Sequence, residues 1–529
     1  MLFITIVINT LLLFLAIEGP ILLNEAPKTS GKQLVDEWER HWGGIDDDYC
    51  GGLALDSNGN IYLGTTTYEF ELSGRDIVIL RYNYLGEREV YKIWRSGDDE
   101  GVLDLTIDYS DYMYIVGYKG DDILLIKSDN MGVELWNRTW AMGDIARGYG
   151  VKLDSSNNIY LVGLSQIYDP LSSSLVLLKY NANGVLQWYK TWNGTYIKGY
   201  DLAIDSNDDV YVVGGYNFYR FLFAKYDSSG NHLWNKTIYG NSKAYAYDVE
   251  VDSNDNVYVT GEFSSWDTDV ILMKFTNQGF QEWNTTWWHP NNGIDDIGYE
   301  LYIFNETEIY IVGSWEFYGP YADEDDFMRM FMIKFDDDGN LVWGAPHELG
   351  EVSKGWGIDA KGKYIEIDSL GNIYVAGETE GFNSGIAGVS DIFLLKYGVD
   401  TDEDDLSDTQ EIDLFFTNPA DNDTDNDGLS DGSEVWVYQT NPLDEDTDED
   451  GLKDGDEVLV YHTNPKEEDT DRDGFSDYDE VMIHRTSPIN NLSNPNFTPF
   501  YILLTSMIYI LPLLIFFINY YKERKKMMF

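Results

Sequence analysis

The stretch DSNGNIYLG, Asp56 to Gly64, recurs along the chain and decides its fold. Further copies are DYSDYMYIVG from Asp108, DSSNNIYLVG from Asp154, DSNDDVYVVG from Asp205, DSNDNVYVTG from Asp252, the looser FNETEIYIVG from Phe304, and DSLGNIYVAG from Asp368. Their aligned tyrosines, from Tyr62 to Tyr374, stand 46 to 64 residues apart. Self-similarity at such a period is typical of propellers and solenoids, so this repeat is the unit of the fold.

Each copy predicts four short strands, as the fourth copy shows. GYDLAID alternates apolar and polar residues, and VYVVGGY is rich in β-branched and aromatic residues, so both read as strands separated by the turn cluster SNDD. FLFAKY is a third strand, DSSGN a second turn, and HLWNKTIYG a fourth strand. Because a four-stranded unit cannot bury both faces alone, the units are expected to pack radially as the blades of a β-propeller, with an open β-solenoid as the alternative.

The strand count indicates how the ring closes. The seventh copy supplies three strands and stops at Tyr397. The missing strand is EWERHWG, Glu37 to Gly43, because Trp38 and Trp42 keep the four-residue step of the tryptophans in other copies. Period two puts such a pair on one face of a strand. We therefore predict an all-β fold, a seven-bladed propeller of four-stranded blades over residues 35–398, closed by the N-terminal strand so that no sheet edge is left for aggregation.

The phrase D-S-x-x-N-[IV]-Y-[LV]-x-G, together with the LLKY that follows the third and seventh copies, resembles the β-propeller repeat family of bacterial and archaeal surface proteins often labelled SBBP. The resemblance covers about residues 35 to 398. It implies a seven-bladed propeller on a secreted or surface-anchored protein, and it implies no single activity.

A second, acidic repeat follows the first. Four 12-residue units begin at Asp400, Asp423, Asp446 and Asp469, each 23 residues after the last. In DTDNDGLSDGSE, oxygen-bearing side chains occupy positions 1, 3, 5, 9 and 12, glycine at position 6 allows a sharp turn, and position 7 offers its carbonyl, which together suit a calcium ion. Zinc is disfavoured because no Cys or His ligand is present, and magnesium prefers to keep its water. A disordered acidic linker is the alternative.

The predicted calcium ligands recur in each unit, with Leu429, Leu452 and Phe475 contributing backbone carbonyls. The second to fourth units supply Asp423, Asp425, Asp427, Leu429, Asp431 and Glu434; Asp446, Asp448, Asp450, Leu452, Asp454 and Glu457; and Asp469, Asp471, Asp473, Phe475, Asp477 and Glu480. The first unit, with Asp400, Asp402, Asp404, Asp408 and Glu411, is the weaker candidate, because Asp405 stands where glycine belongs.

Eleven residues separate one acidic loop from the next, which leaves room for about one helical turn but not for the two flanking helices of an EF-hand. The segment TNPLDEDTDEDGLKDGDEV resembles the bacterial thrombospondin type 3 repeat, over about residues 399–488. That resemblance implies a calcium-dependent, elongated segment in which ions can be shared between neighbouring repeats. Millimolar extracellular calcium is enough to fill sites with the roughly 10⁻⁴ to 10⁻³ M affinities of extracellular modules.

Both ends of the chain are hydrophobic. Residues 1–25 are interpreted as a signal peptide, with an uncleaved N-terminal anchor as the alternative because no Lys or Arg precedes the apolar core. After a linker at 489–498, residues 499–521 carry no charge and are long enough to cross a bilayer as a helix. The basic tail at 522–529 is expected in the cytoplasm. These features predict a single-pass cell-surface protein with its N-terminal body outside.

Eight N-x-S/T sequons lie in the part predicted to be outside: Asn137, Asn193, Asn235, Asn284, Asn305, Asn422, Asn491 and Asn496. The first four share the context W-N-x-T on the predicted outermost strand of a blade, where a glycan would project. The alternative is a packing consensus that carries no sugar.

Charge and cysteine content limit the function further. The net charge is −58, which excludes nucleic acid as a partner because phosphate binding needs clustered Lys and Arg. The acidic residues concentrate between Asp400 and Glu480, where 31 acidic residues face 3 basic ones. The single cysteine, Cys50, permits no intrachain disulfide and is interpreted as a packing residue.

No catalytic residue is predicted, because HExxH and phosphate-loop motifs are absent and the six histidines are scattered. We expect a surface binding or adhesion protein whose propeller recognises a surface protein or a glycan. The alternatives are an extracellular hydrolase or lyase with its site in the central channel, and a structural surface-layer component, because the fold alone does not decide. The irregular sixth blade, with EFYGPYADEDDFMRM at residues 316–330, is the expected place for function.

Overall fold

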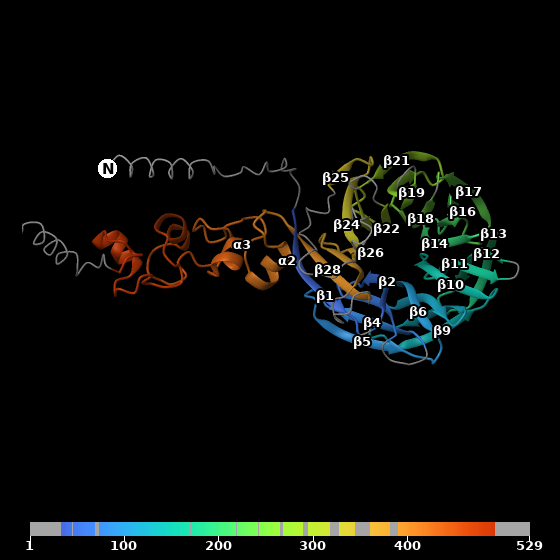
Figure 1. Ribbon diagram of the computed structural model, residues 1–529, viewed down its shortest axis with the longest axis horizontal. Coiled ribbons are helices and arrows are strands. Elements are labelled where there is room, and N and C mark those ends of the chain that lie inside the picture. The colour runs from blue at the N-terminus through green and yellow to red at the C-terminus, as the bar shows by residue number, and fades with distance from the viewer. Residues whose placement is uncertain are drawn as a thin grey trace, which may run out of the picture.

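The computed structural model describes residues 33–491, apart from residue 45 and residues 69–73, 169–170, 218, 242, 265–267, 289–294, 318–326, 344–359 and 381–389. The described residues form seven antiparallel four-stranded sheets arranged around a ring, followed by the acidic repeats (Figure 1). The predicted all-β, seven-bladed propeller is therefore confirmed. The expected signal peptide and membrane helix lie outside the described residues, and none of the helices within these residues is long and apolar enough to span a bilayer.

Within blades 1 to 6 the strands follow the chain from the channel outward. Blade 1 is β2 (Asp48–Leu55), β3 (Ile61–Thr67), β4 (Asp76–Tyr82) and β5 (Arg88–Trp94). Blade 2 is β6 (Glu100–Ile107), β7 (Met113–Lys119), β8 (Asp122–Ser128) and β9 (Glu134–Trp140). Blade 3 is β10 (Ile145–Leu153), β11 (Ile159–Tyr168), β12 (Leu171–Tyr180) and β13 (Leu186–Gly194). Blade 4 is β14 (Ile197–Ile204), β15 (Val210–Tyr216), β16 (Arg220–Tyr226) and β17 (His232–Tyr239).

Blade 5 is β18 (Ala244–Val251), β19 (Val257–Ser264), β20 (Thr268–Phe275) and β21 (Gln281–Trp287). Blade 6 is β22 (Asp295–Phe304), β23 (Glu308–Phe317), β24 (Phe327–Asp336) and the short β25 (Leu341–Trp343). Blade 7 is β26 (Ala360–Ile367), β27 (Ile373–Glu380) and β28 (Ser390–Asp400), completed by β1 (Gln33–Trp42) from the start of the described chain.

The N-terminal strand closes the ring as predicted. β1 pairs antiparallel with β28, from Gln33 opposite Asp400 to Trp42 opposite Ile392. It also reaches the next blade, since the indole nitrogen of Trp38 donates to the carbonyl of Tyr84 at 3.1 Å. Strands from the two ends of the propeller sequence thus share one sheet, which leaves no gap between blades 7 and 1.

The repeated D-S-x-x-N-x-Y phrase builds a turn and ties it to the blade. In blade 4, Asp205 accepts the backbone N–H groups of Asn207 and Asp209, both at 3.0 Å, through one carboxylate oxygen. The other oxygen accepts the Tyr211 hydroxyl at 3.1 Å and lies 2.8 Å from the Lys225 ammonium. An Asp side chain that caps its own turn is a standard stabiliser of tight turns. Equivalent Asp-to-Tyr hydrogen bonds occur at Tyr62, Tyr114 and Tyr374.

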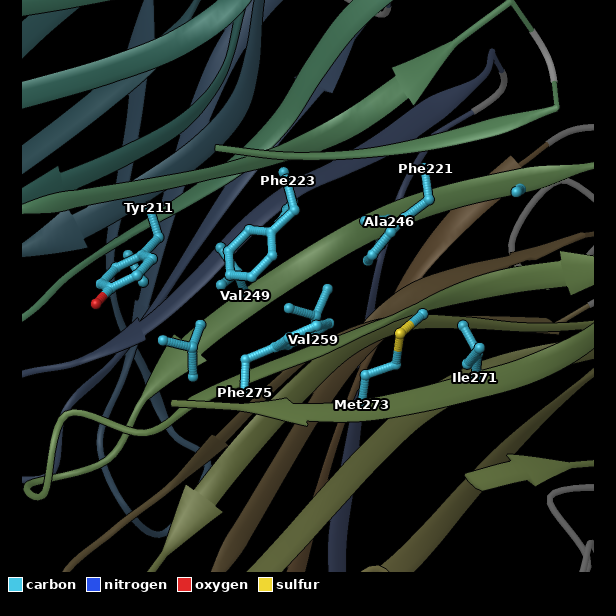
Figure 2. Packing of buried hydrophobic residues seen from close by; sticks show 13 residues of the cluster. Tyr211, Phe221, Phe223, Ala246, Val249, Val259, Ile271, Met273 and Phe275 are labelled. Atoms are coloured by element: carbon cyan, nitrogen blue, oxygen red, sulfur yellow. The ribbon is translucent and has the colours of Figure 1, made fainter. Parts of the chain in front are cut away.

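The apolar faces of neighbouring blades supply the core. Between blades 4 and 5, Phe221 and Phe223 of β16 face Val249 of β18 and Met273 and Phe275 of β20 (Figure 2). Burying each such large side chain contributes about 1.5 to 3 kcal/mol. Similar apolar clusters join each of the six remaining pairs of neighbouring blades. The ring is therefore stabilised by packing between blades rather than within a single blade.

The acidic repeats each contain one short helical turn. These turns are α2 (Asp408–Gln410) with η1 (Glu411–Phe415), α3 (Asp431–Ser433) with η2 (Glu434–Tyr438), α4 (Asp454–Asp456) with η3 (Glu457–Tyr461), and η4 (Asp479–His484). The first repeat contacts blade 7, because Ser407 donates to Glu37 of β1 at 2.6 Å and Asn372 donates to Thr409 at 3.3 Å. Further repeats then follow one another away from the propeller (Figure 1).

Candidate functional site

The acidic loops bring the predicted carboxylates together. In all four repeats the side-chain oxygens at positions 1, 3 and 5 lie within 4.8 Å of one another, beginning with Asp400, Asp402 and Asp404. The turn fixes position 1: in the second repeat Asp423 accepts the N–H groups of Asp427 at 3.1 Å and Gly428 at 3.0 Å. At position 7, the N–H of Leu429 donates to Asp427 at 2.7 Å. Each loop is therefore wound around its own acidic side chains.

Positions 3 and 12 keep oxygens that no protein donor satisfies. In every repeat, at least one buried carboxylate oxygen at each of these positions has no hydrogen-bond partner among the described residues: Asp402, Asp425, Asp448 and Asp471 at position 3, and Glu411, Glu434, Glu457 and Glu480 at position 12. A buried carboxylate oxygen without a donor is costly. Its regular recurrence therefore indicates a cation as the missing partner, and an all-oxygen donor set suits calcium.

The electrostatics of the loops agree with this. Burial, together with the nearby carboxylates of Asp425 and Asp427, raises the pKa of Glu434 to about 8. Burial likewise raises the pKa of Glu411 and Glu457 to about 8, and that of Asp402 to about 7. Carboxylates held together without a counter-ion favour their neutral form, whereas a bound cation would favour the ionised form.

Neighbouring repeats also share residues. Asp427 and Glu434 of the second repeat lie within 4.8 Å of Asp454, which is position 9 of the third. The same junction contains a hydrogen bond from the N–H of Gly455 to Asp427 at 2.7 Å. This bond recurs from Gly432 to Asp404 and from Tyr478 to Asp450, both at 2.8 Å. The position-9 carboxylate therefore approaches the site of the preceding repeat.

Position 9 has a second role within its own loop. Asp431 accepts the N–H and the hydroxyl of Thr424 at 2.8 and 2.6 Å, and Asp408 and Asp477 bind Thr401 and Thr470 in the same way. These contacts orient each position-9 carboxylate by hydrogen bonds. The first repeat differs at position 6, where Asp405 adopts φ 75°, a conformation that disfavours residues with a side chain.

The predicted glycosylation sites are accessible where the structure describes them. Asn137, Asn193, Asn235 and Asn284 lie exposed on β9, β13, β17 and β21, which are the outermost strands of blades 2 to 5. Asn305, Asn422 and Asn491 are also exposed, and Asn496 lies outside the described residues. The expected position of the W-N-x-T strand at the rim is thus confirmed, and its modification stays a prediction.

Sequence reasoning did not identify the residues that line the central channel. Each innermost strand carries a β-bulge, for example between Gly199 and Asp201 of β14, which turns the bulged residue toward the axis. The channel holds a cavity of about 580 Å³, and Cys50 lies in its wall. The sequence did carry a signal for these channel residues. It is a recurring G-Y or A-Y pair before an acidic or small residue, as in GYGV, GYDL, YAYDV and GYEL. Most of the irregular segment 316–330 lies outside the described residues.

Comparison with known families and structures adds one assignment. Residues 423–445, 446–466 and 469–484 match the model of the bacterial TSP3 repeat. The second, third and fourth acidic units are TSP3-type repeats. Repeats of this type are typically calcium-binding, and the propeller combined with them is typical of extracellular or surface proteins. No curated protein sequence matches the chain significantly.

Several solved structures share a similar chain path. Polysaccharide lyase Uly1 is 12% identical with a TM-score of 0.41, covering 68% of this chain and 99% of that one. The β-propeller domain of the Trilobed protease from Pyrococcus furiosus is 8% identical with a TM-score of 0.40, covering 67% and 94%. The acylaminoacyl peptidase of Pyrococcus horikoshii is 10% identical with a TM-score of 0.40, covering 66% and 51%. At identities and TM-scores this low, the similarities say nothing about activity.

Proposed function

We propose that the chain is a cell-surface protein whose calcium-bound repeats form a stalk that displays the β-propeller as a binding head. The observation that carries this proposal is the recurrence, in all four repeats, of donor-free carboxylate oxygens at positions 3 and 12. A disordered acidic linker gives no reason for such regular placement. Membrane attachment through residues 499–521 and glycans on the blade rims belong to the same proposal.

Calcium would act at the junctions between repeats as well as within the loops. Because Asp454 approaches Asp427 and Glu434, an ion held there would link the second repeat to the third. Without it, the facing carboxylates repel one another and the junction loosens. Metal binding then supplies the ordering free energy for a segment that buries few apolar side chains. Several such junctions in a row convert a chain of small units into a stiff spacer.

The test is a calcium titration of the full chain, followed by calorimetry and small-angle scattering. We expect several ions to bind, the maximum dimension to become sharply defined, and magnesium to reproduce neither effect. The variant Asp454→Asn should lose affinity at the junction, whereas Asp456→Asn, an exposed neighbour, should behave as the unmodified chain. No saturable binding at millimolar calcium would reject the stalk, and equal effects of both variants would reject the shared site.

A further inference from the structure

The central cavity is a second candidate site, distinct from the acidic repeats. It is about 580 Å³ in volume and is lined by residues from the innermost strands of all seven blades. That volume falls in the range of roughly 300 to 1,000 Å³ that small-ligand sites occupy. The cavity is lined by both aromatic rings and charged groups, and these side chains indicate which class of ligand it could bind.

One half of the wall is a row of tyrosines. Tyr149, Tyr200, Tyr247 and Tyr299 occupy the bulged position on four consecutive blades, β10, β14, β18 and β22. Their rings contact in sequence, with centroid distances of 6.2, 5.0 and 5.8 Å. The same position is Gly51, Leu103 and Lys363 on the remaining blades, so the row of bulged tyrosines is confined to blades 3 to 6.

Lys198 stands at the tyrosine wall without a carboxylate partner. Its ammonium lies 3.6 Å from the centroid of Tyr149 and 4.4 Å from that of Tyr200. Three other cations of the cavity do have partners: Lys152 with Glu250 at 2.7 Å, Lys363 with Glu378 at 2.5 Å, and Arg75 with Asp99 at 3.8 Å. Among the described residues, no carboxylate comes within 4.0 Å of the Lys198 ammonium.

The carboxylates of the cavity are already engaged. Asp104 accepts the N–H of Val151 at 2.7 Å, Asp248 that of Leu301 at 2.7 Å, and Glu300 that of Ile365 at 2.5 Å. Each hydrogen bond joins one blade to the next, so these carboxylates stabilise the contacts between neighbouring blades. Lys198 is the second residue of β14 and therefore lies near the start of its innermost strand.

The start of β14, with Lys198, lies at the propeller face away from the acidic repeats. The repeats leave the propeller at the end of β28, beside the 368–372 turn that follows the end of β26. The beginning of β26 and of the other innermost strands is at the opposite face. A ligand that reaches Lys198 from this face meets neither the repeats nor their negative charge directly.

We propose that the cavity binds a carboxylated saccharide, with the carboxylate on Lys198 and a sugar ring against the row of tyrosines. A half-buried cation that lacks an acidic partner among the described residues favours an anion from the ligand. Flat tyrosine faces suit the apolar face of a sugar ring, and their hydroxyl groups can hydrogen-bond to its alcohols. This inference rests on the proposed function, because it names the ligand class of the displayed head.

The test is calorimetric titration of the full chain, in saturating calcium, with a galacturonic acid trisaccharide. We expect saturable binding that is at least about tenfold tighter than for the neutral galactose trisaccharide. Lys198→Met should weaken it by about tenfold or more. The control is Lys190→Met, because Lys190 also lies over a ring, that of Trp188 at 5.7 Å, but on the outer strand β13. That variant should bind as the unmodified chain does.

Several results would overturn the proposal: no binding at millimolar trisaccharide, equal affinity for the neutral sugar, or unchanged affinity in Lys198→Met. Equal affinity for benzoate, which has a carboxylate and a flat face but no alcohols, would reject the saccharide. Calcium is titrated separately, so failure of the stalk and failure of the sugar site are distinguishable. Calcium binding with no sugar binding would leave the stalk intact and reject this site alone.

The pH dependence gives an independent readout. Burial lowers the pKa of Lys198 to about 8. The groups beside it are Tyr149 and Tyr200 in the channel and Tyr196 and Tyr245 at the adjoining pocket, and Lys152 and Asp201 line the same cavity. Only the protonated amine attracts a carboxylate, so affinity should be constant below about pH 8 and fall above it. A pH-independent affinity between pH 7 and 10 would contradict the assignment.

Discussion

At the scale of single residues, the sharpest constraint in the acidic repeats is the backbone at position 6. Gly428, Gly451 and Gly474 have φ of 105°, 105° and 97°, well outside the range that residues with a Cβ adopt easily. Asp405 occupies the same position in the first loop, with a φ of 75°. The first loop therefore keeps its acids but closes through a more strained turn than the other three.

We predict that Gly428→Ala destabilises the second loop through backbone strain alone. A Cβ at Gly428 meets nothing within 4 Å, so no steric clash contributes. The strain should amount to about 1 to 2 kcal/mol and should appear as weaker calcium binding in a titration of the full chain. Gly59→Ala is the control, since φ there is 75° with nothing within 4 Å, but the turn belongs to the propeller. Equal calcium affinity in both variants would contradict the prediction.

The glutamates at position 12 predict how pH acts on the repeats. Burial raises the pKa of Glu411, Glu434 and Glu457 from 4.5 to about 8 when no cation is bound. Folding without calcium then takes up protons between about pH 4.5 and 8, so the stability of the repeats should fall as pH rises through this window. Calcium reverses the effect, because binding releases those protons.

Calcium affinity should therefore rise between pH 6 and 8, with proton release that disappears above about pH 8. Calorimetry in two buffers of different ionisation enthalpy counts the protons released. If the apparent binding enthalpy is independent of the buffer at pH 7, these carboxyl groups do not hold their protons in the ion-free state.

At the scale of elements, the strand that closes the ring carries an ion pair. Lys396 of β28 is fully buried and lies 2.7 Å from Glu37 of β1, which is also buried and accepts the Ser407 hydroxyl from the first repeat. One carboxylate thus joins the first strand, the last strand and the first repeat. A buried pair of this kind adds specificity of register more reliably than net stability.

We predict that Lys396→Met costs about 3 to 5 kcal/mol, because it leaves Glu37 buried without its cation. Thermal or denaturant unfolding of the full chain measures the loss. The double variant Glu37→Gln with Lys396→Met should recover much of it. Lys243→Met, which removes a partly exposed pair with Asp295 at 3.4 Å, should cost no more than about 1 kcal/mol. If Lys396→Met and Lys243→Met are equally stable, the ion pair between Lys396 and Glu37 does not hold the closing strand.

The same elements show what the sequence can predict. The D-S-x-x-N turn and the Trp38 and Trp42 pair are local signals, so the blades and the closing strand could be predicted directly. The contact of Asp454 with Asp427 and Glu434 could not, because a 23-residue period gives no information on how one repeat is rotated against the next. Tyr149 and Lys198 were also missed, since a β-bulge shifts which residues face the channel and alternation alone cannot locate it.

At the scale of the whole molecule, the propeller has two different faces. Lys198 lies toward the face where the innermost strands begin, and the acidic repeats lie at the other face. The core of the propeller consists of apolar contacts between blades and contains no cluster of metal-binding side chains among the described residues. Its stability should therefore be independent of calcium.

We predict that chelation of calcium separates the two parts. Hydrogen exchange on the full chain should show protection lost across residues 400–491 and retained in the innermost strands of the propeller. Heating in chelator should leave the main unfolding transition within a few degrees of its calcium-bound value. A large downward shift of that transition would show that the repeats support the propeller rather than only extend from it.

The pairing of β1 with β28 also determines how the molecule would resist a pulling force. A pull on the repeats enters the propeller at Asp400 and runs along β28, which is held on one side by β1 and on the other by β27. The force is then parallel to the strand, so the hydrogen bonds on both sides are loaded in shear and share the load. A strand peeled from one end would instead break its bonds one after another. The closure of the ring therefore also gives the head a mechanically strong attachment point.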